Sequence, residues 1–367
     1  MIRKYIYLIF ILTCLAKPNP CFADDLFELS DSNPASSQYR KKFLASYGIN
    51  PAIEPKLSEK DRPLQEKVLP HIGNNPQKAI EIIESTIESD TNPAFLNVLG
   101  NLYYQIQDYT QSEKYLIQSL KKFPSLRRSW RTLALCYVQQ DKLEKAIKPL
   151  LKVIELGGGD AQSYGLLAYS YLNGEKFESA LSAYRMARMF EPDSFDFKRG
   201  QALCLLNTNQ SKSAIALFDE LIQDEPNEPS FWTAQASAYL EMNQTDKAIA
   251  NLQILHDLEM SDWKSLNLLG DLFLKKTLPE LATKYYTLAL DYGNQQNTNQ
   301  LLRPLNNLLS QNYFKQANAL MKSINAVTGN KTLLRKSIDY QFMKAKIELN
   351  TGSAEVALNI LEKIISK

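Results

Sequence analysis

The sequence predicts an all-α fold, a solenoid of antiparallel helix hairpins, and three observations support this prediction. Glycine and proline are scarce, with 13 and 16 in 367 residues, whereas β-sandwiches, barrels and dinucleotide-binding folds need many tight turns. Small residues recur every 34 residues along the middle of the chain. Each 34-residue interval also contains two stretches with apolar residues at helical spacing, separated by a short polar break.

The first element, residues 1–23, is expected to be an export signal. Two basic residues precede a largely apolar stretch at 6–15. Ten residues are too few for the about 20 that cross a bilayer, so the stretch predicts a cleaved signal rather than an anchor. Small residues before Asp24 place the cut there. The alternative is lipidation at Cys14 or Cys21, but neither has Gly, Ala or Ser just before it.

The next two elements lead into the repeats. Residues 24–57 begin with an acidic, polar stretch and are expected to be poorly ordered. Residues 58–92 predict a divergent hairpin that caps the solenoid, since terminal repeats need a different outer face. Ser58 and Asp61 have the spacing of a capping box that opens its first helix, and the Asn-Pro pair at 75–76 opens its second.

Six regular units follow, at residues 93–296. We define the reference position of each unit by its small residue, and the six are Gly100, Ala134, Ala168, Ala202, Ala236 and Gly270. Twelve residues later stands Ser once and Ala five times, and sixteen residues later a large apolar or aromatic residue. Two small residues that face each other let the two helices of a hairpin approach closely.

The last element, residues 297–367, predicts two degenerate hairpins that are out of phase with the six. Ala317 and Ala357 are their expected close-contact positions. Local departures also occur inside the regular units, where Gln201 and Gln235 replace the apolar residue before the reference position. These departures affect individual contacts and not the architecture.

The repeat resembles a known family, the tetratricopeptide repeat (TPR), whose pattern is W-x₂-L-G-x₂-Y…A-x₃-F…A…P. One copy here runs W-x₂-L-A-x₂-Y…A from Trp130 to Ala146, and another runs Y-x₂-L-A-x₂-Y…A-x₃-Y…A…P from Tyr164 to Pro192. The resemblance covers the six units. It implies a right-handed superhelix of antiparallel hairpins that binds protein partners in a concave groove lined by the first helix of each unit.

The resemblance also implies which residues line the groove. They are Asn97, Asn101, Tyr104, Arg128, Arg131, Tyr169, Asn173 and Arg199. Asparagine amides can hold the backbone of an extended or helical peptide, and tyrosine supplies flat contact area at low entropic cost. Three arginines within three consecutive units suit an acidic or C-terminal carboxylate partner. The alternative is that these residues form an ordinary solvated face.

No pattern for catalysis, a metal or a cofactor is found, so we expect a non-enzyme without a cofactor. His71 and His256 lack any recurring carboxylate or thiol arrangement. The Gly-rich stretch at 157–160 lacks the Lys-Ser/Thr of a phosphate loop and predicts a turn between units. Cys136 and Cys204 should lie about 20 Å apart, since packed helices are roughly 8–10 Å apart, and a disulfide needs less than about 7 Å.

Charge and export together define the expected function. Without Arg3, Lys4 and Lys17 of the signal, 39 basic residues face 40 acidic ones, so neither nucleic acid binding nor direct membrane insertion is expected. We expect a non-catalytic scaffold or adaptor in a Gram-negative periplasm that binds protein partners of a cell-envelope complex. The chain is similar to periplasmic repeat proteins of Ton-type energy-transducing or other envelope complexes.

A second function remains open, a glycan-binding accessory protein in cell-wall or exopolysaccharide assembly. Aromatic residues of the groove would then stack on sugar rings. Trp130 and Trp232 occupy the packing position of their first helices, which weakens this alternative.

Overall fold

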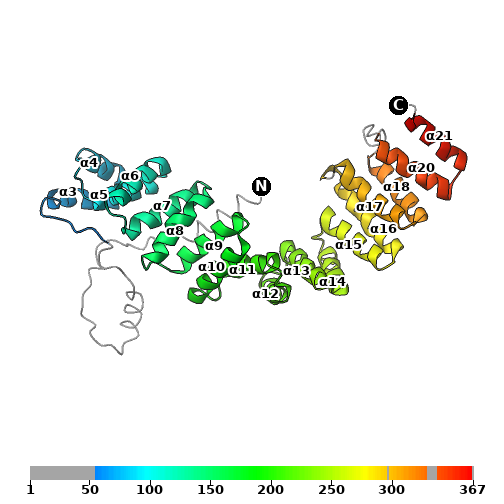
Figure 1. Ribbon diagram of the computed structural model, residues 1–367, viewed down its shortest axis with the longest axis horizontal. Coiled ribbons are helices and arrows are strands. Elements are labelled where there is room, and N and C mark those ends of the chain that lie inside the picture. Colours follow the sequence, from blue (N-terminus) through cyan, green and yellow to red (C-terminus); the bar gives the residue numbers. More distant parts are fainter. Residues whose placement is uncertain (1–53, 296, 329–336, 366–367) are drawn as a thin grey trace.

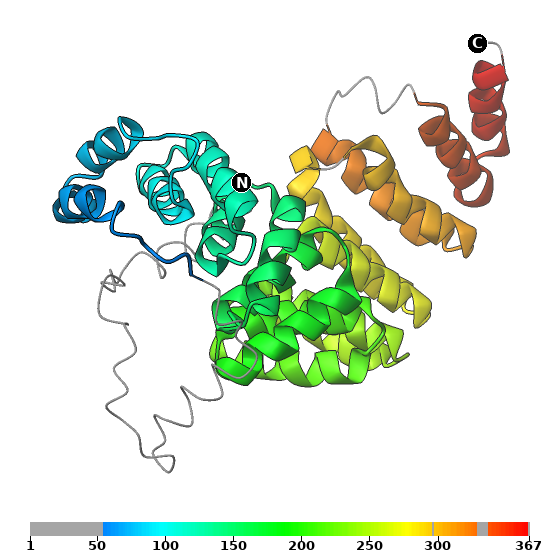
Figure 2. The same ribbon diagram turned by 60° about the vertical axis from the view of Figure 1, so that its left-hand side comes forward.

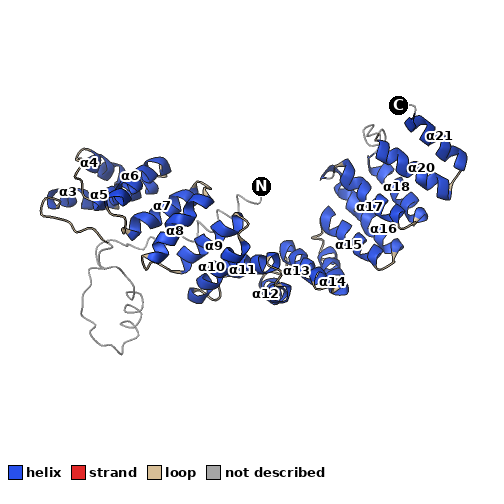
Figure 3. Ribbon diagram, in the orientation of Figure 1, coloured by secondary structure: helices blue, strands red, loops and turns tan. Residues whose placement is uncertain are grey.

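The computed structural model describes residues 54–295, 297–328 and 337–365, and its regular structure there is entirely helical (Figure 3). Helix hairpins stack one after another along the chain, from α3 at one end to α21 at the other (Figure 1). The predicted all-α solenoid is therefore confirmed. The expected export signal and residues 24–53 of the expected N-terminal segment lie outside the described residues.

The six regular units begin and end 34 residues apart. Their first helices are α5 (Pro93–Gln105), α7 (Arg127–Gln139), α9 (Ala161–Asn173), α11 (Phe195–Asn207), α13 (Pro229–Glu241) and α15 (Trp263–Lys275). Their second helices are α6 (Tyr109–Lys122), α8 (Leu143–Glu155), α10 (Phe177–Phe190), α12 (Ser211–Asp224), α14 (Thr245–Asp257) and α16 (Pro279–Ala289).

Further hairpins flank the six units at both ends. The N-terminal one consists of α3 (Arg62–Ile72) and α4 (Pro76–Glu84). After α16, the 3₁₀ helix η1 (Leu290–Gln295) leads to α17 (Thr298–Ser310) and α18 (Phe314–Thr328), and the last hairpin is α20 (Ile338–Thr351) and α21 (Ala354–Ile365). In Figure 2 the stack curves, so that the two ends rise on opposite sides of the central units.

Close approach of the two helices in each hairpin explains the repeat of small residues. The reference alanines and the alanines twelve residues later are fully buried. A Cβ atom added to Gly100 would lie 2.6 Å from Cγ of Leu116, and one added to Gly270 would lie 2.4 Å from the Tyr286 ring. The large residue sixteen positions after the reference therefore fills the space that the small one leaves open.

The turn inside each regular unit also repeats. One residue in every turn is left-handed, with φ between 56° and 64°, and the six are Gln107, Asp141, Glu175, Asn209, Asn243 and Thr277. The N–H of the next residue donates to the carbonyl oxygen three residues after the reference position at 2.8–2.9 Å, the pattern of a Schellman cap. The sequence predicted a polar break at each turn but not this conformation, because glycine or asparagine usually takes it and four of the six residues are of other types.

The last two hairpins keep the internal geometry of the regular units. Ala317 follows the buried Leu305 by twelve residues, and Ala357 follows the buried Ala345 by twelve. Leu305 and Ala345 are thus their reference positions, 35 and 40 residues after the preceding ones. The loss of phase seen in the sequence therefore arises in the connections between hairpins.

At the N-terminal hairpin, the structure corrects one local expectation. The first helix begins at Arg62, and Asp61 accepts hydrogen bonds from the backbone N and Oγ of Ser58 at 2.7 and 2.8 Å, so Ser58 is not the N-cap residue. Two contacts also join residues 54–57 to later parts of the chain. Glu54 forms an ion pair with Arg128 at 3.0 Å, and Asn92 donates to the carbonyl of Lys56.

The departure at Gln235 has a structural counterpart. Its amide is buried and donates to Oδ1 of Asp219 at 2.6 Å, and it accepts from Asn251 at 2.6 Å. The buried apolar residues fall into separate clusters here, one ending at Phe231 and the next beginning at Ala236. A polar bridge from Asp219 through Gln235 to Asn251 therefore lies where one apolar cluster ends and the next begins.

The two cysteines give a first testable prediction. Cys136 and Cys204 are free thiols with fully buried side chains, and burial raises the pKa of Cys136 to about 11 and that of Cys204 to about 12. Because the thiolate is the reactive form, neither should react with a thiol reagent at pH 8 in the native protein. Both should react after denaturation without reductant. An intramolecular disulfide found by mass spectrometry would contradict the repeat register.

Candidate protein-binding groove

The candidate site is the continuous surface made by the first helices, which we call the groove. Several first helices contact the first helix of the next unit, among them α5 with α7, α9 with α11 and α11 with α13. Side chains at equivalent positions of successive first helices can therefore form rows across units. One such row, one residue after the reference position, consists of Leu135, Tyr169 and Leu203. All three are half-buried and pack on the central core cluster. Tyr169 was predicted for the groove, whereas the two leucines were missed.

The predicted arginines flank this row, but each is paired with a carboxylate of the chain. Arg131 forms an ion pair with Asp160 and lies 3.3 Å from Oγ of Ser163. Arg199 pairs with Asp196 at 3.1 Å, and Arg128 pairs with Glu54 as described above. All three guanidinium groups remain partly exposed. Arg131 and Arg199 are thus held by carboxylates of the chain while part of each side chain stays exposed.

Asp160 joins this surface to the start of α9. Its Oδ1 accepts a hydrogen bond from the backbone N of Ser163 at 2.8 Å, as the N-cap residue of that helix. Burial opposes ionisation of this carboxyl, but the hydrogen bonds from Ser163 and the charge of Arg131 hold its pKa below the usual value. The Asp160 carboxylate therefore both caps the N-terminus of α9 and forms the ion pair with Arg131.

The two asparagines of α5 that were predicted for the groove accept hydrogen bonds from side chains of the next unit. Asn97 is buried, and its Oδ1 accepts from Oγ of Ser129 in the next unit at 2.9 Å. Asn101 is half-buried and accepts from Oγ1 of Thr132 at 2.6 Å. The prediction that Asn97 offers its amide on an open surface is wrong, because the neighbouring first helix covers it.

The remaining predicted residues stay at the surface. Tyr104 is half-buried, with its ring centre 5.7 Å from that of Tyr109. Asn173 is exposed, and its amide donates to the carbonyl of Tyr169 at 2.9 Å, on the same helix. The structure thus combines Arg131, Tyr169 and Arg199 on consecutive first helices of the second to fourth units.

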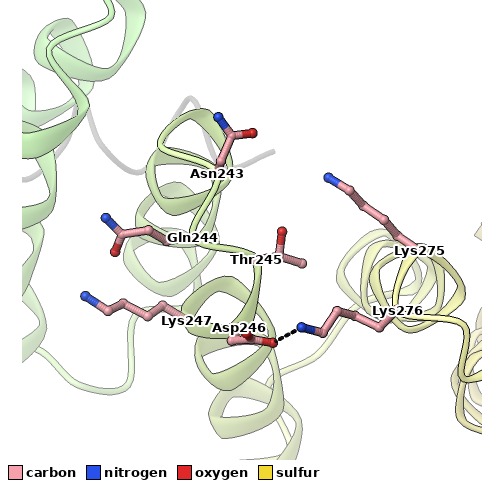
Figure 4. Close-up of a pocket in the computed structure, with 7 residues that line it drawn as sticks. All are labelled: Asn243, Gln244, Thr245, Asp246, Lys247, Lys275 and Lys276. Atoms are coloured by element: carbon pink, nitrogen blue, oxygen red, sulfur yellow. Dashed lines mark ion pairs between the residues drawn. The ribbon is translucent and has the colours of Figure 1, made fainter.

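Two hollows lie outside this central surface. One, of about 600 Å³, is lined by polar residues at the turn 243–247 and by Lys275 and Lys276. Figure 4 shows Lys276 reaching Asp246, an ion pair of 2.7 Å, while Gln244 and Lys247 point away. It is open and carries no arrangement of acid, base or nucleophile.

The other hollow, of about 430 Å³, lies between α17 and α20, the first helices of the last two hairpins. Leu302, Leu309, Phe342 and Met343 supply apolar side chains there, with charged groups around them. A carboxylate network adjoins it, since Asp271 accepts hydrogen bonds from Arg303 and Asn307 at 2.6 and 2.9 Å. The groove therefore continues into the C-terminal hairpins.

The features that were weighed for chemistry have structural explanations. His256 packs edge-on against Tyr285, with ring centres 5.5 Å apart. The Gly-rich stretch forms the turn between α8 and α9, where Gly157 is left-handed. In the described ranges, no three His, Cys, Asp or Glu side chains come close enough to hold a metal ion. No helix described by the structure is long and apolar enough to cross a membrane.

Comparisons with known proteins agree with this architecture. A family model described as "Tetratricopeptide repeat" matches residues 62–295. The TPR domain-containing protein PYG7, chloroplastic, from Arabidopsis thaliana is 25% identical over 120 residues, which are 32% of this chain. The chain thus spans 40% of the length of that curated relative.

The chain is also similar to solved structures. MamA from Desulfovibrio magneticus is 18% identical, with a TM-score of 0.43, and the match covers 47% of this chain and 97% of that one. YrrB, described as a TPR protein with an unusual peptide-binding site, is 15% identical, with a TM-score of 0.46, and the match covers 51% of this chain and 97% of YrrB. From the family match over most of its length, the chain belongs to the tetratricopeptide repeat family.

Proposed function

We propose that the chain is an exported, non-catalytic adaptor of a Gram-negative periplasm that holds protein partners of a cell-envelope complex in its groove. A Ton-type energy-transducing system is one such complex. The observation that carries the proposal is the half-buried row Leu135, Tyr169 and Leu203 with Arg131 and Arg199 beside it. This surface suits a peptide segment that presents apolar side chains next to carboxylates.

The internal ion pairs are compatible with such a ligand. Exposed ion pairs contribute little to stability because water and salt screen them, and the side chains of Asp160 and Asp196 are 45% and 36% exposed. A carboxylate of the partner can therefore replace Asp160 or Asp196 as the hydrogen-bond acceptor of one guanidinium nitrogen with little loss of folding free energy. Meanwhile the internal carboxylates hold both arginines in place, which reduces the entropy lost on binding.

The glycan-binding alternative receives less support from the tryptophans. Trp130 donates from Nε1 to the carbonyl of Pro124 at 2.7 Å, and Trp232 donates to the carbonyl of Pro226 at 2.8 Å. Both indoles are thus tied to the turn that precedes their helix, and they do not belong to the half-buried row. Binding of cell-wall oligosaccharides without any protein capture would favour this alternative.

The groove proposal predicts the effect of a double variant, Arg131→Gln with Arg199→Gln. Glutamine removes the charge but, unlike glutamate, does not place a second carboxylate beside Asp160. Because hydrogen bonds to charged groups are worth roughly 1.5–3 kcal/mol, partner capture should weaken by about tenfold or more. Crosslinking in intact cells followed by quantitative mass spectrometry measures the capture.

The matched control is Lys176→Gln with Lys212→Gln, which removes the same charge from exposed positions at the starts of second helices. We expect this control to capture the same proteins as the parent. Equal capture by the parent and by the arginine variant, at the same salt concentration, would contradict the groove proposal. The partner site would then have to be sought in the last two hairpins.

Export predicts the start of the mature protein. Residues 1–23 should be removed, so that the protein isolated from the periplasm begins at Asp24. Intact-mass measurement and N-terminal sequencing check this start. A lipid-modified Cys14 or Cys21 at the N-terminus would show instead that the protein is anchored to a membrane.

A further inference from the structure

The stretch before α3 runs along the starts of the first helices. Asn92, the N-cap residue of α5, donates from Nδ2 to the carbonyl of Lys56 at 3.0 Å and to Oδ2 of Asp61 at 3.1 Å. Glu54 forms an ion pair with Arg128, near the start of α7, at 3.0 Å. Followed back from α3, the chain therefore crosses the start of α5 and then reaches the start of α7 (Figure 1).

This course leads towards the groove. Arg128, Arg131 and Leu135 are spaced by three and four residues, so they form one stripe along α7. Glu54 therefore contacts the first residue of a stripe that continues to the half-buried row. The next first helices in the same direction, α9 and α11, carry the rest of that row. Residues that precede Glu54 enter the groove when they keep the direction of the stretch before α3.

The start of α7 also carries more positive charge than its ion pairs neutralise. Arg127, Arg128 and Arg131 stand against two carboxylates there, those of Glu54 and Asp160. Burial and the charge of Arg131 lower the pKa of Arg127, and the two carboxylates offset this only in part. The remaining positive charge attracts a further carboxylate to this part of the groove.

The segment that precedes Glu54 contains side chains that suit this surface. Residues 24–31 read DDLFELSD, with four carboxylates, three large apolar side chains and no basic residue. The ligand proposed above for the groove presents apolar side chains next to carboxylates, and this stretch has that composition within the chain itself. A polar segment of this kind buries too little apolar surface to fold alone, but binding to a surface can order it.

A nearer stretch fits the groove less well. Residues 43–47 contain three large apolar side chains and are closer to Glu54, but residues 40–42 just before them are all basic. Those charges would lie against Arg131 and Arg199, and like charges in contact are unfavourable. All four acidic residues of 24–53 lie within 24–31, so only that stretch complements the arginines.

The connecting chain is long enough for this contact. Residues 32–53 connect the acidic stretch to Glu54, and 22 residues can span up to about 70 Å. Arg128 and Arg199 lie on first helices two units apart, or about 20 Å at the usual spacing of packed helices. A flexible link also keeps the stretch at an effective concentration on the order of millimolar, so weak contacts are sufficient for binding.

We propose that residues 24–31 bind in the groove of their own chain, between Arg131 and Arg199, and that a protein partner must displace them. This inference rests on the function proposed above for the groove. The occupied groove binds a partner with lower apparent affinity, because only the fraction of molecules with an open groove can take it up. The segment thereby sets a threshold for partner binding.

The test places a photo-crosslinker on the acidic stretch of the full chain, at Ser30→Cys. Cys136 and Cys204 are buried thiols with raised pKa values, so a maleimide reagent at neutral pH labels only the introduced thiol. After illumination, mass spectrometry identifies the crosslinked peptides. We expect them in α7, α9 and α11, with a yield that does not change over a dilution series.

Charge variants test what holds the stretch in the groove. Asp25→Asn with Glu28→Gln should lower the crosslink yield about tenfold, because charge-assisted hydrogen bonds to the arginines are lost. Arg131→Gln with Arg199→Gln should lower it to a similar extent. The matched control is the change of residues 41 and 42 from lysine to glutamine, which neutralises two charges of the same segment and should not lower the yield.

Partner capture tests the displacement. In intact cells, Asp25→Asn with Glu28→Gln should raise the capture of envelope proteins severalfold, since more grooves are then open. The control at residues 41 and 42 should capture as much as the parent. Capture that the acidic variant leaves unchanged would show that the bound segment does not compete with the partner.

Other results would overturn the occupancy itself. Crosslinks outside α7, α9 and α11, or a control that loses as much yield as the acidic variant, would exclude it. A yield that falls on dilution would show that the stretch binds a second copy instead. Absence of groove crosslinks, with capture still lost in the arginine variant, would refute only the occupancy. Groove crosslinks in the parent, with undiminished capture in the arginine variant, would refute the proposed function of the groove instead.

Discussion

Replacing Phe218 by alanine is expected to destabilise the middle of the solenoid by about 3–5 kcal/mol. Phe218 stands sixteen residues after the reference position of the fourth unit and is fully buried. Its ring centre is 6.5 Å from that of Phe231 in the fifth unit. The substitution therefore leaves a cavity both inside one hairpin and at the seam between two units.

Because each unit contacts mainly its neighbours, the damage should be local. Hydrogen exchange should speed up in α11 to α14 and remain unchanged in α5 to α8. Phe218→Leu, which keeps more of the volume, should cost less than alanine. Lys212→Ala on the same helix is the exposed control and should stay within about 0.5 kcal/mol of the parent.

The second large effect is expected from adding volume, with Ala180→Leu. Ala180 is fully buried in α10, twelve residues after Ala168, which is fully buried in α9. A larger side chain must push the two helices of the third unit apart, and overpacking costs about 1–3 kcal/mol. The loss should show as faster hydrogen exchange in the second to fourth units.

Ser179→Leu is the matched control, since it adds a leucine at the neighbouring, exposed position of the same helix. Its exchange pattern should resemble that of the parent. Uniform destabilisation along the whole chain after Ala180→Leu would instead show that the solenoid unfolds as a single unit. The picture of units that depend only on their neighbours would then be wrong.

The hairpins could be predicted from the sequence because their contacts are close along the chain. A small residue and an alanine twelve positions later meet through one short turn, so their spacing alone shows the geometry. The same spacing holds at Ala317 and Ala357, where only the longer connections disturbed the period. The left-handed turn residues, by contrast, show no consistent residue type.

The groove was predicted less well because its residues meet across units. Asn97 and Ser129 are 32 residues apart and Arg131 and Asp160 are 29 apart, so these contacts depend on how one unit rotates against the next. Only the pairing of Arg199 with Asp196 lies within one helical turn. That acidic residue three positions before the arginine was the one signal of pairing visible in the sequence.

The sequence by itself determined the helical class, the 34-residue unit and the small residues that let helices approach, since these follow from local spacing. The tertiary structure alone decided which polar side chains are exposed and which are buried in contacts with other units. Whether a side chain such as Asn97 is buried or exposed depends on the unit that packs beside it.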